Sequence, residues 1–134
     1  MKQLVDRAGM TDSIYIDSAG LTSDHHGCAA DSRMRAHGLR RGYILDSISR
    51  PVTVADFEDF DIIIGMDNEN IRQLKSRTKT PEQRAKIQPM CDYIQNMPYT
   101  EVPDPYYGGE EGFEIVLDIL EDACAGLLEA IAKR

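Results

Sequence analysis

The sequence predicts an α/β fold, in which helices cover a small parallel β-sheet. The apolar run DIIIGMD, residues 61–67, contains three consecutive isoleucines, which is typical of a strand buried on both faces of a parallel sheet. Predicted strands alternate along the chain with predicted helices, which favours right-handed crossovers between parallel strands. The chain has 134 residues, of which 42% are apolar, and this suits a single domain with a hydrophobic core.

The first part of the chain contains two further predicted elements. Residues Ile14–Asp17 have the pattern of a short strand, and a turn at Ser18–Gly20 would end it. The segment ADSRMRAHGLRRG then predicts a basic, mostly exposed helix that begins near Asp31 and ends near Gly42.

Cap residues mark the starts of three more helices. Thr53 and Asp56 resemble a capping box that opens a helix of one or two turns. Asp67 is placed to cap a helix that continues to about Lys75. Thr80–Pro81 joins a cap residue to a proline at the first helical position, which predicts another short helix.

The last helix has the clearest pattern, and it follows a weaker strand candidate, AKIQPM at residues 85–90. Its apolar residues recur at helical spacing and are Phe113, Val116, Leu117, Leu120, Cys124, Leu127 and Ile131. Cys124 lies on this stripe, so we expect it to be a core residue. Sites in such folds gather beyond the C-terminal ends of the strands, where Ser18–Cys28, Gly65–Asn70 and the segment around Asp104 are expected to meet.

Composition and charge exclude several classes of function. The net charge of −8 argues against nucleic acid and anionic membranes as partners. No apolar run approaches the ~20 residues of a membrane span, and MKQLVDRAG is too polar for a signal peptide. We therefore expect a cytoplasmic protein. The three cysteines and three histidines lack the spacing of a disulfide framework or a metal site, so we expect no bound metal ion.

The segment VPDPYYGGEEGFE, residues 102–114, presents one carboxylate in an unusual setting. Prolines flank Asp104 on both sides and hold it on a stiff, extended backbone. Tyr106 and Tyr107 follow and are suited to stack on a flat substrate ring. Two interpretations fit this pattern: a preorganised general acid beside an aromatic wall, or a stiff loop whose Asp is a solvated turn former.

Three motifs resemble, in order, those of the low-molecular-weight protein-tyrosine phosphatases. They are IDSAG, SRPVTVADFEDFDIIIGMDNEN and VPDPYYGGEEGFEIVLDIL, at residues 16–20, 49–70 and 102–120. The resemblance covers essentially the whole chain, so residues 1–134 are expected to form one domain. It implies a three-layer α/β/α architecture with a small parallel sheet, similar to Rossmann-like folds.

The resemblance also implies roles for five residues. Asp104 falls on the general acid of the family, and Tyr106 and Tyr107 fall on the aromatic residues that line its substrate cleft. Ser18 falls on the serine that supports the phosphate-binding loop. His25 stands near the position of a larger aromatic wall residue, because this chain has SDHHG where the family often has SDWH.

One part of the family pattern is not found. Members begin with a strand and a C-x(5)-R loop, whose cysteine is the nucleophile and whose arginine holds the phosphoryl oxygens. MKQLVDRAG resembles the end of the helix that follows this loop. We therefore expect a domain that is incomplete at its N-terminus and lacks its first central strand. Two explanations fit: the chain starts at an internal methionine, which we favour, or the protein has lost the segment naturally.

Cys28 is not expected to replace the absent nucleophile. Only four residues separate it from Arg33 in HHGCAADSR, where the family loop has five. No glycine lies between them to let the backbone curl around an anion, and Asp31 would repel phosphate. We interpret Cys28 as a thiol near the start of a helix.

The resemblance implies the activity of a protein-tyrosine phosphatase, through a phosphocysteine intermediate, on a phosphotyrosine protein or a small phosphomonoester. It implies no metal ion and no organic cofactor. This chain itself is expected to be inactive. The main alternative is a non-catalytic pseudophosphatase or protein-interaction module. An arsenate reductase is less favoured, because its relay cysteines would have to be Cys91 and Cys124, which are far apart in the sequence. An exposed sheet edge would allow two chains to form a homodimer.

Overall fold

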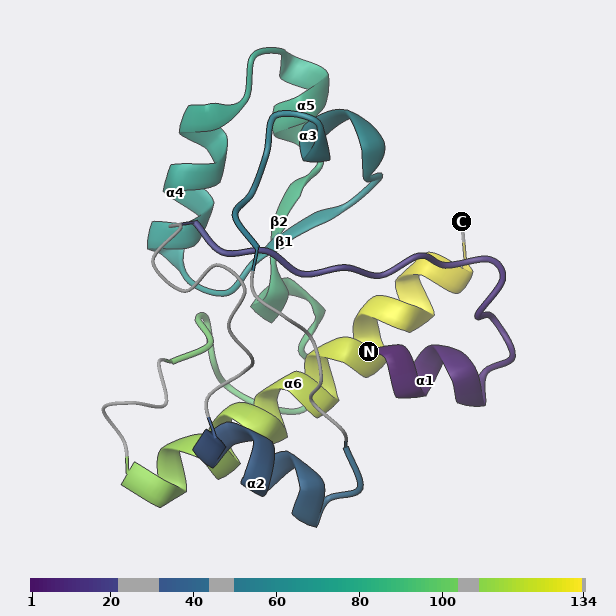
Figure 1. The fold of residues 1–134 in the computed structure, drawn as a ribbon, viewed down its shortest axis with the longest axis vertical. Coiled ribbons are helices and arrows are strands. Elements are labelled where there is room, and N and C mark those ends of the chain that lie inside the picture. The colour runs from purple at the N-terminus through teal and green to yellow at the C-terminus, as the bar shows by residue number, and fades with distance from the viewer. Residues whose placement is uncertain (22–31, 44–49, 104–108, 134) are drawn as a thin grey trace.

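The computed structural model describes residues 1–21, 32–43, 50–103 and 109–133 of the chain. In chain order its elements are α1 (Lys2–Arg7), α2 (Ser32–Arg40), α3 (Asp56–Asp59), β1 (Ile63–Gly65), α4 (Asn68–Arg77), α5 (Pro81–Ala85), β2 (Ile87–Pro89), the 3-10 helix η1 (Met90–Tyr93) and α6 (Gly109–Ala132) (Figure 1). No described helix is both long and apolar enough to cross a membrane.

The two described strands form a parallel pair, as DIIIGMD and AKIQPM predict. Ile63 of β1 lies opposite Ile87 of β2, and Gly65 lies opposite Pro89. The connection between them contains α4 and α5, so this part of the chain is a strand–helix–strand crossover. The expected α/β class with a parallel sheet is confirmed.

Successive side chains of β1 point to two separate hydrophobic clusters. Ile63 packs against the cluster of Phe57, Leu74 and Ile87, which joins the sheet to α3 and α4. Ile64 packs against the cluster that α6 dominates, whose buried members are Met90, Val102, Val116, Ile119, Ala123 and Cys124. Because strand side chains alternate between faces, helices cover both faces of the sheet.

Helix α6 provides most of the second cluster, and its predicted stripe is present. Five of the seven stripe residues are buried, while Leu120 and Ile131 are half-buried. Cys124 is in the core, as expected. The helix packs closely on η1, because a Cβ added at Gly126 would lie 2.0 Å from the carbonyl oxygen of Tyr93.

Local signals predicted most helix ends correctly. The Asp67 carboxylate accepts the Asn70 N–H at 2.7 Å at the start of α4, and Thr80 Oγ1 accepts the Gln83 N–H at 3.1 Å at the start of α5. Helix α2 is followed by Gly42, whose φ is +86°, a conformation that glycine adopts without strain. These three boundaries agree with the predictions to within a few residues.

A helix forms near the predicted position at α3, but the predicted cap residue, Thr53, is wrong. Ala55 occupies the cap position and makes no side-chain cap hydrogen bond. Only half of the expected capping box forms: the Asp56 carboxylate accepts the Thr53 N–H at 2.8 Å. The reason is that Val54 and Ala55 form a turn before the helix begins, so Asp56 is the first helical residue.

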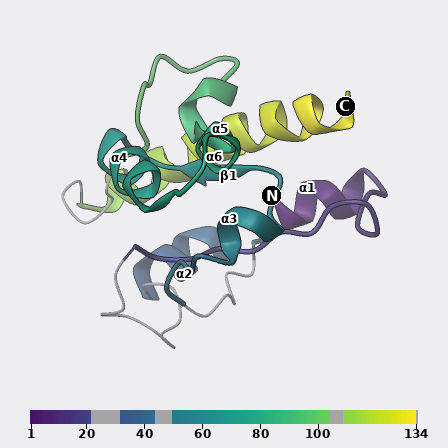
Figure 2. The same cartoon turned by 90° about the horizontal axis from the view of Figure 1, so that it is seen from above.

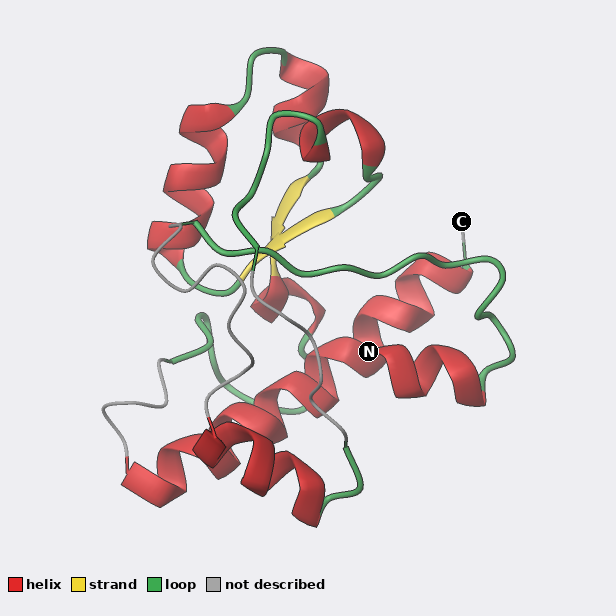
Figure 3. Ribbon diagram, viewed as in Figure 1, coloured by secondary structure: helices red, strands yellow, loops and turns green. Residues whose placement is uncertain are grey.

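The predicted strand at Ile14–Asp17 and the turn at Ser18–Gly20 are also wrong. Both lie in an extended loop that crosses the molecule from α1 (Figures 2 and 3). A strand needs a hydrogen-bonded neighbour along its length, and here only Gly20 forms a bridge, a parallel one with Pro51. The Tyr15 ring instead stacks on Phe60, with 5.8 Å between ring centroids.

Candidate active site

Of the five residues predicted to form the site, the structure describes only Ser18. Asp104, Tyr106, Tyr107 and His25 lie outside the described residues, and so does Cys28. Ser18 is exposed in the extended loop. What the structure shows of the site is therefore the framework on each side of these segments.

An arginine anchors the loop that carries Ser18. The Ser18 N–H donates to Asp17 Oδ1 at 2.7 Å, and Arg50 Nε donates to Asp17 Oδ2 at 3.1 Å. The Arg50 carbonyl accepts the Gly20 N–H at 2.7 Å. Arg50 thus binds the segment on both sides of Ser18, once through its side chain and once through its backbone.

Arg50 is itself held by a bidentate ion pair with Asp56. Nη1 and Nη2 each donate to one carboxylate oxygen at 3.0 Å, the geometry in which guanidinium and carboxylate interact most strongly. The hydrogen bonds from Arg50 lower the pKa of Asp56, and the same contact raises the pKa of Arg50. Sequence reasoning included Arg50 in a family motif without giving it a role, because no local pattern indicates that its partners lie on both sides of it.

The backbone just before Asp104 is fixed to the end of β1. The buried Val102 donates its N–H to the Met66 carbonyl at 2.8 Å. One residue earlier, the Glu101 carboxylate accepts the Asn68 N–H at 3.0 Å at the start of α4. Pro103 therefore leaves from the C-terminal end of a parallel strand, which is where sites in such folds are usually found.

The Asn70 side chain stabilises the turn between β1 and α4. Its Oδ1 accepts the Met66 N–H at 3.2 Å, while its own backbone N–H is capped by Asp67. The turn between β1 and α4 and the segment at Val102 thus form one hydrogen-bonded unit. The motif GMDNEN predicted a helix cap here but did not predict the contact with Val102, which comes from 36 residues further along the chain.

On the far side of the segment 104–108, α6 is held by aromatic and charged contacts. The Phe113 ring is only 1% exposed, and the His37 ring stacks on it with 5.2 Å between centroids and 10° between planes. The Arg33 guanidinium lies 5.0 Å from the centroid of the same ring, within the range of a cation–π interaction. Helix α2 thus packs against the first turns of α6 through His37 and Arg33.

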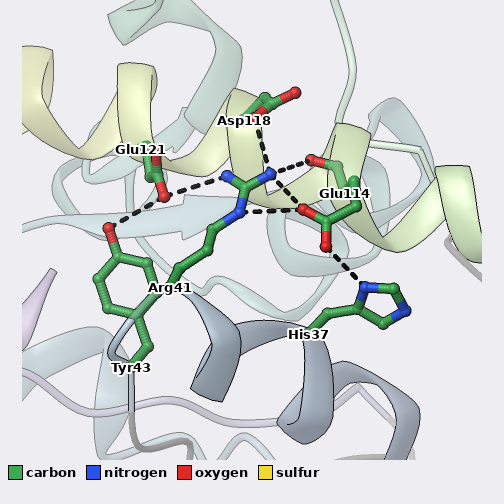
Figure 4. A network of polar contacts seen from close by, with 6 residues as sticks. All are labelled: His37, Arg41, Tyr43, Glu114, Asp118 and Glu121. Atoms are coloured by element: carbon green, nitrogen blue, oxygen red, sulfur yellow. Dashed lines mark hydrogen bonds and ion pairs between the residues drawn. The ribbon is translucent and has the colours of Figure 1, made fainter.

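A polar network extends this contact along α2 and α6 (Figure 4). Glu114 accepts from His37 Nδ1 at 2.7 Å and from Arg41 Nε at 3.0 Å. Arg41 also binds Asp118 and Glu121, at 2.9 Å and 3.1 Å. Burial opposes the charge of Arg41, but its three carboxylate partners outweigh this and raise its pKa. His37 also lowers the pKa of Glu114, with Arg41 as the second cause.

The described cysteines offer no exposed nucleophile. Cys124 is buried in the core, and Cys91 is half-buried against the same cluster. Burial raises the pKa of the Cys91 thiol, and the carboxylates of Asp92 and Glu101 raise it further. In the described part of the chain, no cluster of three or more His, Cys, Asp or Glu side chains could hold a metal ion.

Known proteins of one family resemble this chain along its length. The family described as low molecular weight phosphotyrosine protein phosphatase matches residues 1–134. A Synechocystis protein, provisionally named as a low molecular weight protein-tyrosine-phosphatase, is 41% identical over 133 residues, which cover 99% of this chain and 85% of the relative.

Solved structures agree with the sequence comparison. A protein tyrosine phosphatase from Entamoeba histolytica, with Hepes in its active site, superposes with a TM-score of 0.95 at 48% identity, covering 98% of this chain and 84% of that one. A Drosophila arginine phosphatase superposes with a TM-score of 0.86 at 32% identity, covering 97% and 84% of the two chains. The chain thus shares the small α/β fold of these structures.

Proposed function

The chain belongs to the low molecular weight phosphotyrosine protein phosphatase family. We propose that it contributes the general acid, Asp104, to a phosphatase active site. The hydrogen bond from Val102 to Met66 carries this proposal, because it brings the backbone before Asp104 to the C-terminal end of β1. Tyr106, Tyr107 and His25 are proposed to line the substrate, and Ser18 to support the phosphate-binding loop.

The proposed reaction transfers the phosphoryl group twice. A cysteine thiolate of a C-x(5)-R loop attacks phosphorus, the bond between phosphorus and the leaving oxygen breaks, and Asp104 gives its proton to that oxygen. Water then attacks the phosphocysteine. The Asp104 carboxylate takes a proton from this water, which releases phosphate and returns the thiolate.

The chain alone is proposed to be inactive. None of its three cysteines is followed, after five residues, by an arginine. A general acid contributes ~10²–10⁴-fold, but only to a reaction that has an attacking group. Without the thiolate, the arginine and the ring of backbone N–H groups, the nucleophilic and electrostatic contributions are missing.

The test compares the chain with a version extended ahead of Met1. The extension is the strand and C-x(5)-R loop of a family member that carries the motif. We expect no measurable hydrolysis of p-nitrophenyl phosphate by the chain and clear turnover by the extended version. Asp104→Asn in the extended version should lower kcat strongly and change substrate binding much less, whereas Cys28→Ser should change little.

Two results would overturn this assignment. Turnover by the chain alone that Cys28→Ser abolishes would make Cys28 the nucleophile. Full kcat in the extended Asp104→Asn variant would remove Asp104 from the reaction. The arsenate reductase alternative is less favoured, because Cys124 is buried and Cys91 is half-buried with a raised pKa.

An interaction module is the second candidate, and the edge of β1 favours it. The described sheet has two strands, so β1 pairs with β2 along one edge only. Unpaired strand edges bind other strands, and a second copy of this chain could supply one. Light scattering tests this: a concentration-dependent dimer supports it, and a monomer at all concentrations contradicts it.

A further inference from the structure

Positive charge is concentrated at the connection between α4 and α5. Residues 75–86 contain five basic side chains and one acidic side chain, Glu82, which gives +4, whereas the rest of the chain carries −12 of the total of −8. We call the five basic residues the basic corner; they are Lys75, Arg77, Lys79, Arg84 and Lys86.

No described carboxylate forms an ion pair with a side chain of the basic corner. Arg77 donates to the Leu21 carbonyl at 2.7 Å, and Lys86 donates to the Phe57 carbonyl at 2.8 Å. Both acceptors are uncharged backbone groups, which orient the side chains and leave their charge in place. Lys75, Lys79 and Arg84 are exposed, and none of the five forms an ion pair with a described carboxylate, whereas three arginines elsewhere do: Arg41, Arg50 and Arg72.

Helix electrostatics explain only part of this concentration. Lys75 and Arg77 lie in the last turn of α4, and Arg84 in the last turn of α5, where a positive charge interacts favourably with the helix dipole. Lys86 is the C-cap residue of α5, whereas Lys79 lies in the connection between the two helices. Lys79 and Arg84 line a shallow surface hollow together with Thr78, Thr80, Pro81 and Ala85.

Lys79 and Arg84, which line the hollow, lie away from the candidate active site, although Arg77 contacts Leu21, three residues after Ser18. Figure 1 places α5 and the end of α4 at one end of the molecule, whereas α2 and the start of α6 lie at the other end. The hollow between Lys79 and Arg84 is therefore separate from the phosphate-binding machinery proposed above. A ligand bound there would contact the protein independently of catalysis.

We propose that the basic corner docks an acidic segment of a protein partner. Exposed cations that lack carboxylate partners attract anions, and the hollow offers a place for a short peptide between Lys79 and Arg84. The charge of −12 on the remainder of the chain disfavours long polyanions, since nucleic acid or an anionic membrane would also meet this acidic surface. A short acidic segment contacts the corner alone.

Fluorescence anisotropy with a labelled hexaglutamate peptide tests this docking on the 134-residue chain. We expect binding at low ionic strength that weakens as salt is added, because salt screens exposed charges. The double variant Lys79→Glu, Arg84→Glu should bind at least about tenfold more weakly, since two attractions become two repulsions. The neutral pair Lys79→Gln, Arg84→Gln should have an intermediate effect.

The matched control changes the same net charge elsewhere. Lys2 and Arg35 are exposed on α1 and α2, so Lys2→Glu, Arg35→Glu gives an equally acidic chain with the corner intact. This control should keep most of the affinity. Equal losses in the two charge-reversal variants would overturn the proposal, and so would binding to double-stranded DNA or phosphatidylserine vesicles without binding to the peptide. Circular dichroism confirms that each variant is folded.

Discussion

Gly126 of α6 faces the backbone of η1 so closely that no side chain fits between them. A Cβ at this position would lie 2.0 Å from Tyr93 O and 3.1 Å from its carbonyl carbon. In an open helix interior, Gly→Ala would stabilise by about 1 kcal/mol. Here the obstacle is backbone, which cannot rotate away as a flexible side chain can.

We therefore expect Gly126→Ala to lower the free energy of unfolding by about 1–3 kcal/mol, the usual cost of overpacking. Urea denaturation followed by circular dichroism measures this. An unchanged or higher midpoint would show that η1 does not contact α6 as described. The exposed Ala125 is next to it, and Ala125→Gly provides a control for helix propensity without a steric clash.

A second prediction for a single residue concerns Asp67, which caps the start of α4. Its side chain satisfies the Asn70 N–H, so Asp67→Ala should cost about 1 kcal/mol of stability, whereas Asp67→Ser should retain most of it. Thermal unfolding of the three proteins measures the difference. Equal midpoints for the Ala and Ser variants would contradict the capping role.

At the scale of elements, the network around Arg41 and Glu114 attaches α2 to α6. Contacts to His37 and Arg41 lower the pKa of Glu114 below its ordinary value of 4.5. A carboxyl whose pKa is lower in the folded state stabilises the fold above the unfolded-state pKa. This stability is lost as the pH falls through the folded-state pKa.

Glu114→Gln should therefore lower the urea midpoint at pH 7 and have a smaller effect in acid, where Glu114 is protonated in the parent too. Urea denaturation at a series of pH values checks this. Glu82→Gln removes an exposed carboxylate on α5, outside this network, and is the control. A penalty for Glu114→Gln that is the same at every pH would contradict the ionic role of Glu114.

Elements were predictable where their signals are local. Asp67 and Thr80 mark helix starts through side chains that bond a backbone N–H three residues later, and the stripe on α6 repeats within one helix. The strand predicted at Ile14–Asp17 failed because strand formation depends on a neighbour elsewhere in the chain. The same limit hid the anchoring roles of Arg41 and Arg50, since ion pairs such as that between Arg41 and Glu114 join residues 73 positions apart.

At the scale of the whole molecule, the candidate site was predictable from short motifs rather than from physical pattern alone. Proline on both sides of Asp104 indicated a stiff, presented acid, but equally a solvated turn, and the family resemblance decided between them. The structure adds the hydrogen bond from Val102 to the end of β1. A contact between Met66 and Val102 follows from the fold, and nothing in the sequence around either residue indicates it.

The central claim is that Asp104 protonates the leaving group. The most direct measurement compares p-nitrophenyl phosphate with phenyl phosphate as substrates of the extended version and its Asp104→Asn variant. Phenolate is the poorer leaving group and needs the proton more. We predict that Asp104→Asn lowers kcat/KM for phenyl phosphate by a clearly larger factor than for p-nitrophenyl phosphate, and equal factors for the two substrates would contradict a general-acid role for Asp104.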